Sequence, residues 1–396
     1  MTTIDQLKAQ GIPVTADGGV TETKTVVHTV DQLRALLDLG LDDQGRRAHY
    51  DALFGGTQPA SDDGALLSRR IAAHVVGNAS LSHEDRAAIA PAFPLTAYVT
   101  AASGPLTISS AYDLSTPDGS MRVVSFTDVV MNQGGYFLCE STPLTFTCNT
   151  LTRNGSSGST TMADFNILGR VGSTPQPPPP PSGGQTQASP GAPGQCTSAG
   201  VAGSGGGAGS PGARGTNGTA GNTGGNGTPS MQASITILQT LTANALSVRS
   251  QSGPGGAGSA GGVGGPGQIG GQGGNGATCD CTGNGGGPGG TGGQGGDGGA
   301  GGSGGNGVNA MGNVTVRVPT AADTSKVQKL PQEAPPGAGG AGGPGGPGGG
   351  GGYGGSGGKG NSGGGNGGSG NPGTYGPAGQ PGTGSGAPGQ INPILA

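Results

Sequence analysis

The stretch GGPGGTGGQGGDGGAGGSGGNG, residues 286–307, is seven consecutive Gly-Gly-X triplets followed by one more glycine. A period of three recurs over residues 191–227, 255–276, 339–363 and, after a phase shift, 370–382. A flexible linker has no physical reason to keep one period over eight or more triplets. The period therefore indicates that these tracts are ordered, and it limits what fold the rest of the chain can have.

Composition restricts a conventional hydrophobic core to the first part of the chain. Of 396 residues, 96 are Gly and 31 are Pro, while 3% are aromatic and 10% are charged. So much Gly is typical of collagen-like or disordered sequences, and most apolar residues precede about residue 172. The formal net charge is −4 and the Gly tracts are nearly uncharged, so we expect no nucleic-acid binding by a basic stripe.

Residues 1–95 predict a small α-helical module. The run Thr29-Val30-Asp31-Gln32 has the spacing of a capping box at the start of a helix. Further helices are expected over residues 42–54 and 64–76, and a short one from Ser82. A module of this length is close to the smallest that can bury a sufficient core.

The next part of the chain, residues 96–172, predicts a short all-β module. Segments such as MRVVSF and PLTFTC alternate with turn residues at intervals of about ten, which suits a small sandwich or a β-solenoid. Residues 173–190 contain TPQPPPPPS and predict a stiff Pro-rich linker. The Gly-rich region then covers residues 191–396, with β segments expected at 234–250 and 313–318.

The approaches to these two β segments resemble each other. GGNGTPSMQASITI begins at Gly224 and GGNGVNAMGNVTV begins at Gly304. Both contain GGNG, a Met and an alternating β-branched strand. The similarity indicates an internal repeat of triplet tract, turn and strand.

Three structures compete for the triplet tracts. A collagen triple helix needs long uninterrupted runs and abundant Pro, whereas these runs are short and many triplets are Gly-Gly-X. Disorder is favoured by composition alone. The period favours a packed bundle of polyglycine II helices, in which Gly lets neighbouring backbones approach and exchange hydrogen bonds. We therefore expect a multi-domain chain: a helical module, an all-β module, and a polyglycine II bundle interleaved with short strands.

The tracts resemble the snow-flea antifreeze proteins and the polyglycine bundles at the tips of some phage long tail fibres. The resemblance covers about residues 190–390 and rests on the triplet period, so it implies a bundle and carries over no binding residue. Ice binding would need a flat face of uniform small side chains. The X positions of residues 286–307 are too mixed for that: Pro288, Thr291, Gln294, Asp297, Ala300, Ser303 and Asn306.

The five cysteines predict two disulfides and one leftover thiol. Cys139 and Cys148 flank a turn-like STP and are expected to pair, and Cys196 is expected to pair with Cys279 or Cys281. The alternative is a cytosolic protein with unpaired cysteines. The sequence has no apolar run typical of a signal peptide or membrane span. An extracellular or cell-surface location would therefore need leaderless export or a place in a virion.

No catalytic, cofactor-binding or metal-binding residues are predicted. All four His lie in the helical module outside any metalloprotease motif, and one C-x-C without a nearby His is a weak metal signal. GxGxxG matches arise by chance in such a Gly-rich chain. We therefore expect that the protein is not an enzyme.

The function favoured by the sequence is that of a non-enzymatic extracellular structural protein that assembles with itself into fibres or a surface or matrix layer. Unpaired strand edges would mediate this assembly, and the candidate residues are Val314, Val316, Val318, Ile235 and Ile237. The alternative is a phage or cell-surface adhesin that binds a receptor or glycan. Its recognition loops would be TCDCTGNGG, residues 278–286, or GGYGGSGGKGNSGG, residues 351–364.

Overall fold

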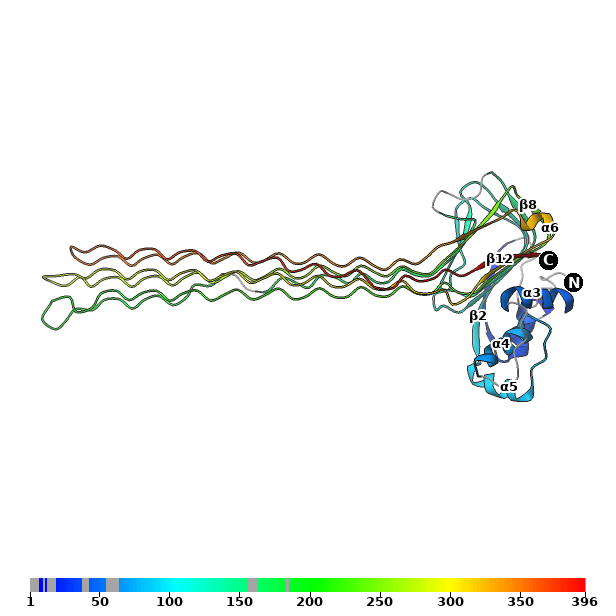
Figure 1. Cartoon of the computed structure of the whole chain (residues 1–396), viewed down its shortest axis with the longest axis horizontal. Helices are drawn as coiled ribbons and strands as arrows, with labels where there is room; N and C mark the ends of the chain where they lie inside the picture. Colours follow the sequence, from blue (N-terminus) through cyan, green and yellow to red (C-terminus); the bar gives the residue numbers. More distant parts are fainter. Residues whose placement is uncertain are drawn as a thin grey trace.

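The molecule consists of a sheet body, with helices packed on one side, and a long thin shaft that projects from it (Figure 1). The shaft is made of Gly-rich connections between strands at residues 169–232, 252–313 and 332–390. The computed structural model describes residues 7–9, 11–12, 19–37, 43–54, 64–155, 162–182 and 185–395.

The helices and strands follow one another along the chain as β1 (Thr21–Val27), α2 (Val30–Leu36), α3 (Asp43–Phe54), α4 (Gly64–Val75), α5 (His83–Ile89), the 3-10 helix η1 (Ala90–Ala92), β2 (Leu95–Ile108), β3 (Ala111–Asp113), β4 (Met121–Met131), β5 (Tyr136–Glu140), β6 (Leu144–Arg153), β7 (Phe165–Leu168), β8 (Ala233–Thr242), β9 (Leu246–Gln251), β10 (Val314–Val318), α6 (Ala321–Thr324), β11 (Val327–Pro331) and β12 (Ile391–Leu395).

The strands form one sheet in the order β1-β2-β4-β6-β8-β10-β12 and a second in the order β11-β9-β7-β5-β3. Neighbouring strands are parallel except for β1, which is antiparallel to β2. From β2 to β12 the chain alternates between the two sheets. Each turn of the chain therefore adds one strand to each sheet, and successive turns stack side by side.

The core of the sheet body lies between the two sheets. Val124, Phe146, Ile235 and Val316 are paired across four neighbouring strands of the seven-stranded sheet. All four are buried in one cluster. Phe165 faces them from the five-stranded sheet, with its ring centroid 5.2 Å from that of Phe146. Each turn thus repeats an inward apolar column, which is what fixes the register of the parallel strands.

The helices pack on the outer face of the seven-stranded sheet near β2. Leu33 of α2 and Val75 of α4 are buried in a second cluster with Val99 and Val123, which point outward from the sheet. At the start of α2 the Thr29 side chain accepts a hydrogen bond from the Gln32 amide, as the capping-box pattern predicts. The helices α3 and α4 begin and end within one residue of their predicted limits.

The predicted fold class is wrong. The sequence predicts consecutive helical, all-β and polyglycine II modules, whereas the structure has two sheets of seven and five strands and few helices. The β segment expected at 234–250 is two strands of different sheets, and the one expected at 313–318 is an interior strand. The Gly-rich tracts are therefore connections within a sheet fold, not a fold class of their own.

Each Gly-rich connection leaves the five-stranded sheet and returns to the seven-stranded sheet, from β7 to β8, from β9 to β10 and from β11 to β12. Each runs out along the shaft and back as two extended segments (Figure 1). The chain reverses at residues 197–202, 278–283 and 358–361. The shaft is thus three hairpin-like excursions lying side by side.

Backbone hydrogen bonds between segments hold the shaft together. The Gly287 amide donates to the Gly274 carbonyl at 2.8 Å within one excursion. Between excursions, the Gly209 amide donates to the Pro288 carbonyl at 2.9 Å. A Cβ added at Gly293 would lie 1.9 Å from a carbonyl oxygen of the neighbouring segment. The triplet period follows, because positions that face other segments must be Gly and X positions face outward.

Candidate functional site

The far end of the shaft brings together turns that are distant in sequence. A disulfide joins Cys196 to Cys279, with a Cα–Cα distance of 5.8 Å across a sequence separation of 83 residues. It ties the turn of the first excursion to that of the second. Of the two partners that the sequence allowed for Cys196, the structure selects Cys279.

The turn of the third excursion is tied to the same place. The Lys359 ammonium donates to the carbonyl oxygen of Asp280 at 3.0 Å. The Asn361 amide nitrogen donates to the carbonyl oxygen of Gly283 at 2.5 Å. All three turns are therefore held together, and we call this group of turns the distal end.

The distal end contains the turns of both loops that the sequence suggested for recognition, residues 278–286 and 351–364. Residues 351–357 of the second loop run along the side of the shaft, where the Gly273 amide donates to the Tyr353 carbonyl. Its exposed side chains include Val201, which is 42% exposed, and Cys281, whose thiol is free. Neither loop could be placed relative to the other from the sequence, because their starts are 73 residues apart. The structure brings them to one surface.

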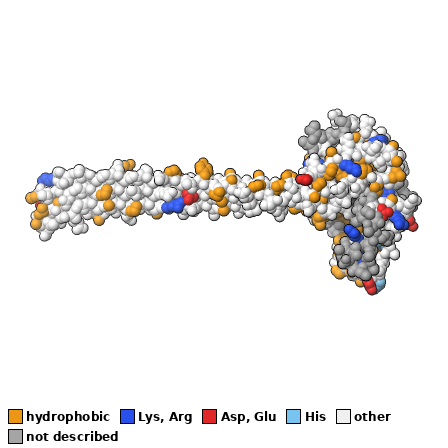
Figure 2. Space-filling model, in the orientation of Figure 1, with side chains coloured by type: hydrophobic (Ala, Val, Ile, Leu, Met, Phe, Trp, Pro, Cys, Tyr) orange, Lys and Arg blue, Asp and Glu red, His pale blue; other side chains and the backbone are white. Residues whose placement is uncertain are grey.

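The shaft surface has few charged side chains (Figure 2). In its middle part, Arg214 forms an ion pair with Asp297. The other carboxylate oxygen of Asp297 accepts hydrogen bonds from the amide and the hydroxyl of Thr374, both at 2.9 Å. The Thr374 amide and hydroxyl, followed by Arg214, hold the pKa of Asp297 below its ordinary value. Asp297 thus links all three excursions.

The expected disulfide between Cys139 and Cys148 is not formed, since both thiols are free and buried. The hairpin interpretation of this segment is wrong: β5 and β6 belong to different sheets. The chain crosses between the sheets at Ser141, whose φ is 46°. Burial raises the pKa of Cys139 to about 12 and also raises that of Cys148, so both thiols stay protonated and unreactive at neutral pH.

The residues that the sequence suggested for assembly lie inside the core. Ile235 and Ile237 of β8, and Val314, Val316 and Val318 of β10, are fully buried between the sheets. Strand β8 is paired with β6 and β10, and β10 is paired with β8 and β12. The excursions of the shaft return to adjacent strands, so these edges are already occupied within the chain.

Ionisable groups in the body connect its elements. His74 of α4 lies 3.0 Å from Asp31 of α2, and Arg86 of α5 pairs with the same carboxylate. Hydrogen bonds from Arg86 and His74 lower the pKa of Asp31. Arg153 and Asp164 form a fully buried ion pair at 2.7 Å.

Among the residues that the structure describes, no three His, Cys, Asp or Glu side chains lie close enough together to hold a metal ion. None of the described helices is long and apolar enough to cross a membrane.

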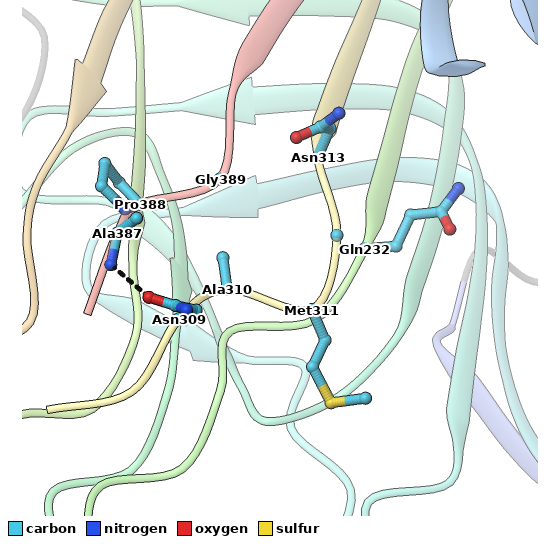
Figure 3. Close-up of a pocket in the computed structure, with 9 residues that line it drawn as sticks. Gln232, Asn309, Ala310, Met311, Asn313, Ala387, Pro388 and Gly389 are labelled. Atoms are coloured by element: carbon cyan, nitrogen blue, oxygen red, sulfur yellow. Dashed lines mark hydrogen bonds between the residues drawn. The ribbon is translucent and has the colours of Figure 1, made fainter. Parts of the chain in front are cut away.

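An open cavity of about 490 Å³ lies where the shaft joins the sheet body (Figure 3). Its walls are the residues that immediately precede β8, β10 and β12, three adjacent strands of one sheet. All three returning segments thus contribute to it. The lining residues are Gln232, Asn309, Ala310, Met311, Gly312, Asn313, Ala387, Pro388 and Gly389.

Two asparagine side chains of this cavity are fixed in orientation. The Asn309 side-chain oxygen accepts from the Ala387 amide at 2.9 Å, and that of Asn313 accepts from the Gln390 amide at 3.0 Å. A Cβ on Gly389 would lie 2.4 Å from the Gly312 carbonyl, so the wall is closely packed there. No pattern in the sequence predicted a site at these residues. The repeated GGNG-to-strand pattern indicated a structural repeat before these strands, but it did not predict a binding site there.

The comparisons with known proteins do not assign the chain to a family. No family model matches it, and no curated protein matches it. Among solved structures, the nine polyproline type II helical bundle springtail antifreeze protein from Granisotoma rainieri is 26% identical and covers 47% of this chain and 94% of its own. The TM-score is 0.06, which carries no argument about the fold. The resemblance expected from the triplet period therefore remains a prediction.

Proposed function

We propose that the protein is a non-enzymatic extracellular binding protein of the adhesin type. In this proposal the sheet body is the base, the shaft is a spacer, and the distal end contacts the target. The observation that carries the proposal is the distal end itself, where a disulfide and side-chain hydrogen bonds join three turns from distant parts of the chain. A shaft without a binding function at its far end would not need a disulfide and side-chain hydrogen bonds there.

The shaft is suited to hold a binding surface away from the body. Its segments are linked sideways by backbone hydrogen bonds at almost every triplet, which resists bending. The outgoing segment of the second excursion has 25 residues, 253–277. An extended chain of that length reaches no more than about 90 Å. The distal end can therefore lie well beyond the outline of the body.

An extracellular location is supported by the disulfide. Cys196 is exposed, and an accessible disulfide persists in oxidising surroundings but is reduced in most cytosols. The target in this proposal is a cell-surface receptor or a glycan. The distal end has little charge besides Asp280 and Lys359, which favours an uncharged target surface over a nucleic acid.

A matched pair of substitutions tests the proposal. Val201 at the distal end and Val263 in the middle of the shaft are 42% and 40% exposed. We expect Val201→Asp to weaken adhesion at least tenfold and Val263→Asp to leave it unchanged. Adhesion is measured with labelled full-length protein on immobilised cells and on a glycan array. Equal effects of the two substitutions would contradict a binding site at the distal end.

A second candidate function is lateral self-association of shafts. It is favoured by Tyr353 and Tyr375, which are 70% and 77% exposed on an otherwise small-residue surface. Exposed aromatic rings on a nearly uncharged surface are typical of contact sites. Electron microscopy of the purified protein distinguishes the two functions. Bundled shafts or filaments that are lost in the Tyr353→Ser, Tyr375→Ser double variant support assembly, and separate particles with one shaft each support the adhesin.

A further inference from the structure

We propose that the cavity at the base of the shaft is a second binding site and that it takes a neutral, hydroxyl-rich ligand, a saccharide unit. This inference does not depend on what the distal end contacts, because the two sites are at opposite ends of the shaft. It rests on the volume of the cavity, its lack of charge, its fixed amide donors and its apolar wall.

The volume of about 490 Å³ lies within the range of pockets that hold small organic ligands. The cavity is open to solvent, so a sugar residue of a longer chain could enter and leave its neighbours outside. The three returning segments run side by side into adjacent strands, and each contributes residues to the lining (Figure 3). One ligand would therefore touch all three excursions of the shaft.

No Lys, Arg, Asp, Glu or His is among the residues that line the cavity. A charged ligand would lose part of its hydration there without gaining an opposite charge, which is unfavourable. Phosphorylated and carboxylated ligands are thus disfavoured. The remaining polar groups are carboxamides and backbone groups, which suit uncharged hydroxyls.

The carboxamides offer the ligand hydrogen-bond donors. Asn309 and Asn313 both use the side-chain oxygen to accept a backbone amide. What each side chain has left for a ligand is its NH₂ group, which carries two donor hydrogens. Because the oxygen is anchored, the NH₂ group is held in place before binding. A hydroxyl oxygen is a matching acceptor, and preorganised donors reduce the entropy lost on binding.

The same cavity also has an apolar side. Met311 is 72% exposed, Ala310 precedes it in the same segment, and Pro388 belongs to the neighbouring segment of the lining. An exposed thioether on a flexible side chain adapts to the shape of an apolar surface. A sugar ring has one face of C–H groups and an edge of hydroxyls. The apolar wall suits the C–H face of the sugar, and the fixed NH₂ donors suit its hydroxyl edge.

The test measures binding of four neutral probes to the full chain by saturation-transfer NMR and titration calorimetry. The probes are the methyl glycosides of glucose, galactose, mannose and N-acetylglucosamine, and glucose 6-phosphate and glucuronic acid serve as charged comparisons. We expect at least one neutral probe to bind and both charged probes to bind at least tenfold more weakly. Absence of binding by all four neutral probes would overturn the proposal.

Asn309→Asp with Asn313→Asp locates the site. The carboxylates still accept the two backbone amides, so the local structure is kept, but the NH₂ donors are replaced by negative oxygens. We expect affinity to fall at least tenfold, which is about the effect of one lost hydrogen bond. Asn226→Asp is the matched control, since its side-chain oxygen also accepts a backbone amide, that of Asn306 at 2.8 Å, outside the cavity. Its affinity should equal that of the parent.

A second pair of variants covers the case in which the Asp pair perturbs folding. Met311→Glu changes an exposed side chain and leaves the fold intact, and it should weaken binding of the same probe at least tenfold. Val263→Glu makes a similar change on the shaft and should have no effect. If Met311→Glu binds the probe as the parent does, the probe binds elsewhere and the proposal is wrong.

Discussion

The sheet body is stabilised mainly by contacts between side chains, whereas the shaft is stabilised mainly by hydrogen bonds between backbone groups. In the body, side chains make the contacts: Phe146 and Phe165 are fully buried and their ring centroids are 5.2 Å apart. In the shaft, backbone groups make the contacts, and the Gly287 amide reaches the Gly274 carbonyl at 2.8 Å. The body therefore requires large residues at fixed positions, whereas the shaft requires that residues at fixed positions have no side chain at all. Four substitutions or conditions test this difference.

The largest effect is expected for Gly295→Val. A Cβ at this position would lie 2.0 Å from the Gly346 carbonyl oxygen, so the neighbouring segment must move and its backbone bonds must break. We expect a loss of about 5 kcal/mol or more in local stability. Hydrogen exchange of the shaft amides measures it. The control is Gln294→Val, which places the same side chain at an exposed X position. If the shaft amides exchange as fast in Gln294→Val as in Gly295→Val, Gly and X positions do not differ in the way described.

The corresponding change in the body is Phe146→Ala. Removal of this fully buried ring leaves a cavity between the sheets, and we expect the free energy of unfolding to fall by about 3–5 kcal/mol. Denaturant unfolding followed by circular dichroism measures the loss. Thr145→Ala, on the opposite face of the same strand, should change the free energy of unfolding by less than about 1 kcal/mol. A smaller loss for Phe146→Ala than for Thr145→Ala would mean that the core does not lie between the sheets.

A smaller effect is expected for Cys196→Ser at the distal end. Loss of a disulfide that closes a long loop typically costs about 2–4 kcal/mol. Because the backbone bonds of the shaft remain, we expect the loss to be confined to faster hydrogen exchange at residues 197–202 and 278–283. Cys281→Ser removes a free thiol and serves as control. If it speeds exchange as much as Cys196→Ser does, Cys281 takes part in the pairing.

The smallest effect concerns pH. The pKa of Asp297 is lowered in the folded shaft by the Thr374 amide and hydroxyl and by Arg214. A lowered carboxyl pKa stabilises the folded state above the ordinary pKa of the group, and this contribution is lost as pH falls through the folded value. We expect the protection factors of amides near Asp297, that is, their exchange rates relative to the intrinsic rate at each pH, to fall slightly below about pH 4. In Asp297→Asn this pH dependence should vanish, and its persistence would assign it to another group.

Local patterns in the sequence predicted local features. The capping box at Thr29 begins α2, and the GGNG repeats precede β8 and β10 by a few residues. The possible partners of Cys196 were Cys279 and Cys281, because these two cysteines are too close in sequence to pair readily with each other. These features depend on residues that are close in sequence, or on the short distance that a disulfide can span.

The parallel pairing of the strands could not be predicted in the same way. YFLC and LTFTC look like the two arms of a hairpin, but the turn at Ser141 passes the chain to the other sheet. Strands β8 and β10 are neighbours although more than 70 residues separate them. Alternation of side chains shows which residues face inward, but it does not show which strand lies beside which. The base cavity depends on that same pairing, so its residues could not be grouped either.

The hydrogen bonds between excursions have a consequence for the time course of synthesis. The Gly212 amide bonds to the carbonyl of Thr291, and the side-chain oxygen of Asn217 accepts the amide of Asp297. These partners are about 80 residues apart. At typical rates of translation the ribosome needs about 4–16 s to add that much chain. Until then the first excursion has only the bonds between its own two segments, such as that from the Gly207 amide to the Ala192 carbonyl. The face that will contact the second excursion stays exposed to proteases and to adjacent nascent chains. The disulfide at the distal end can close only after that wait.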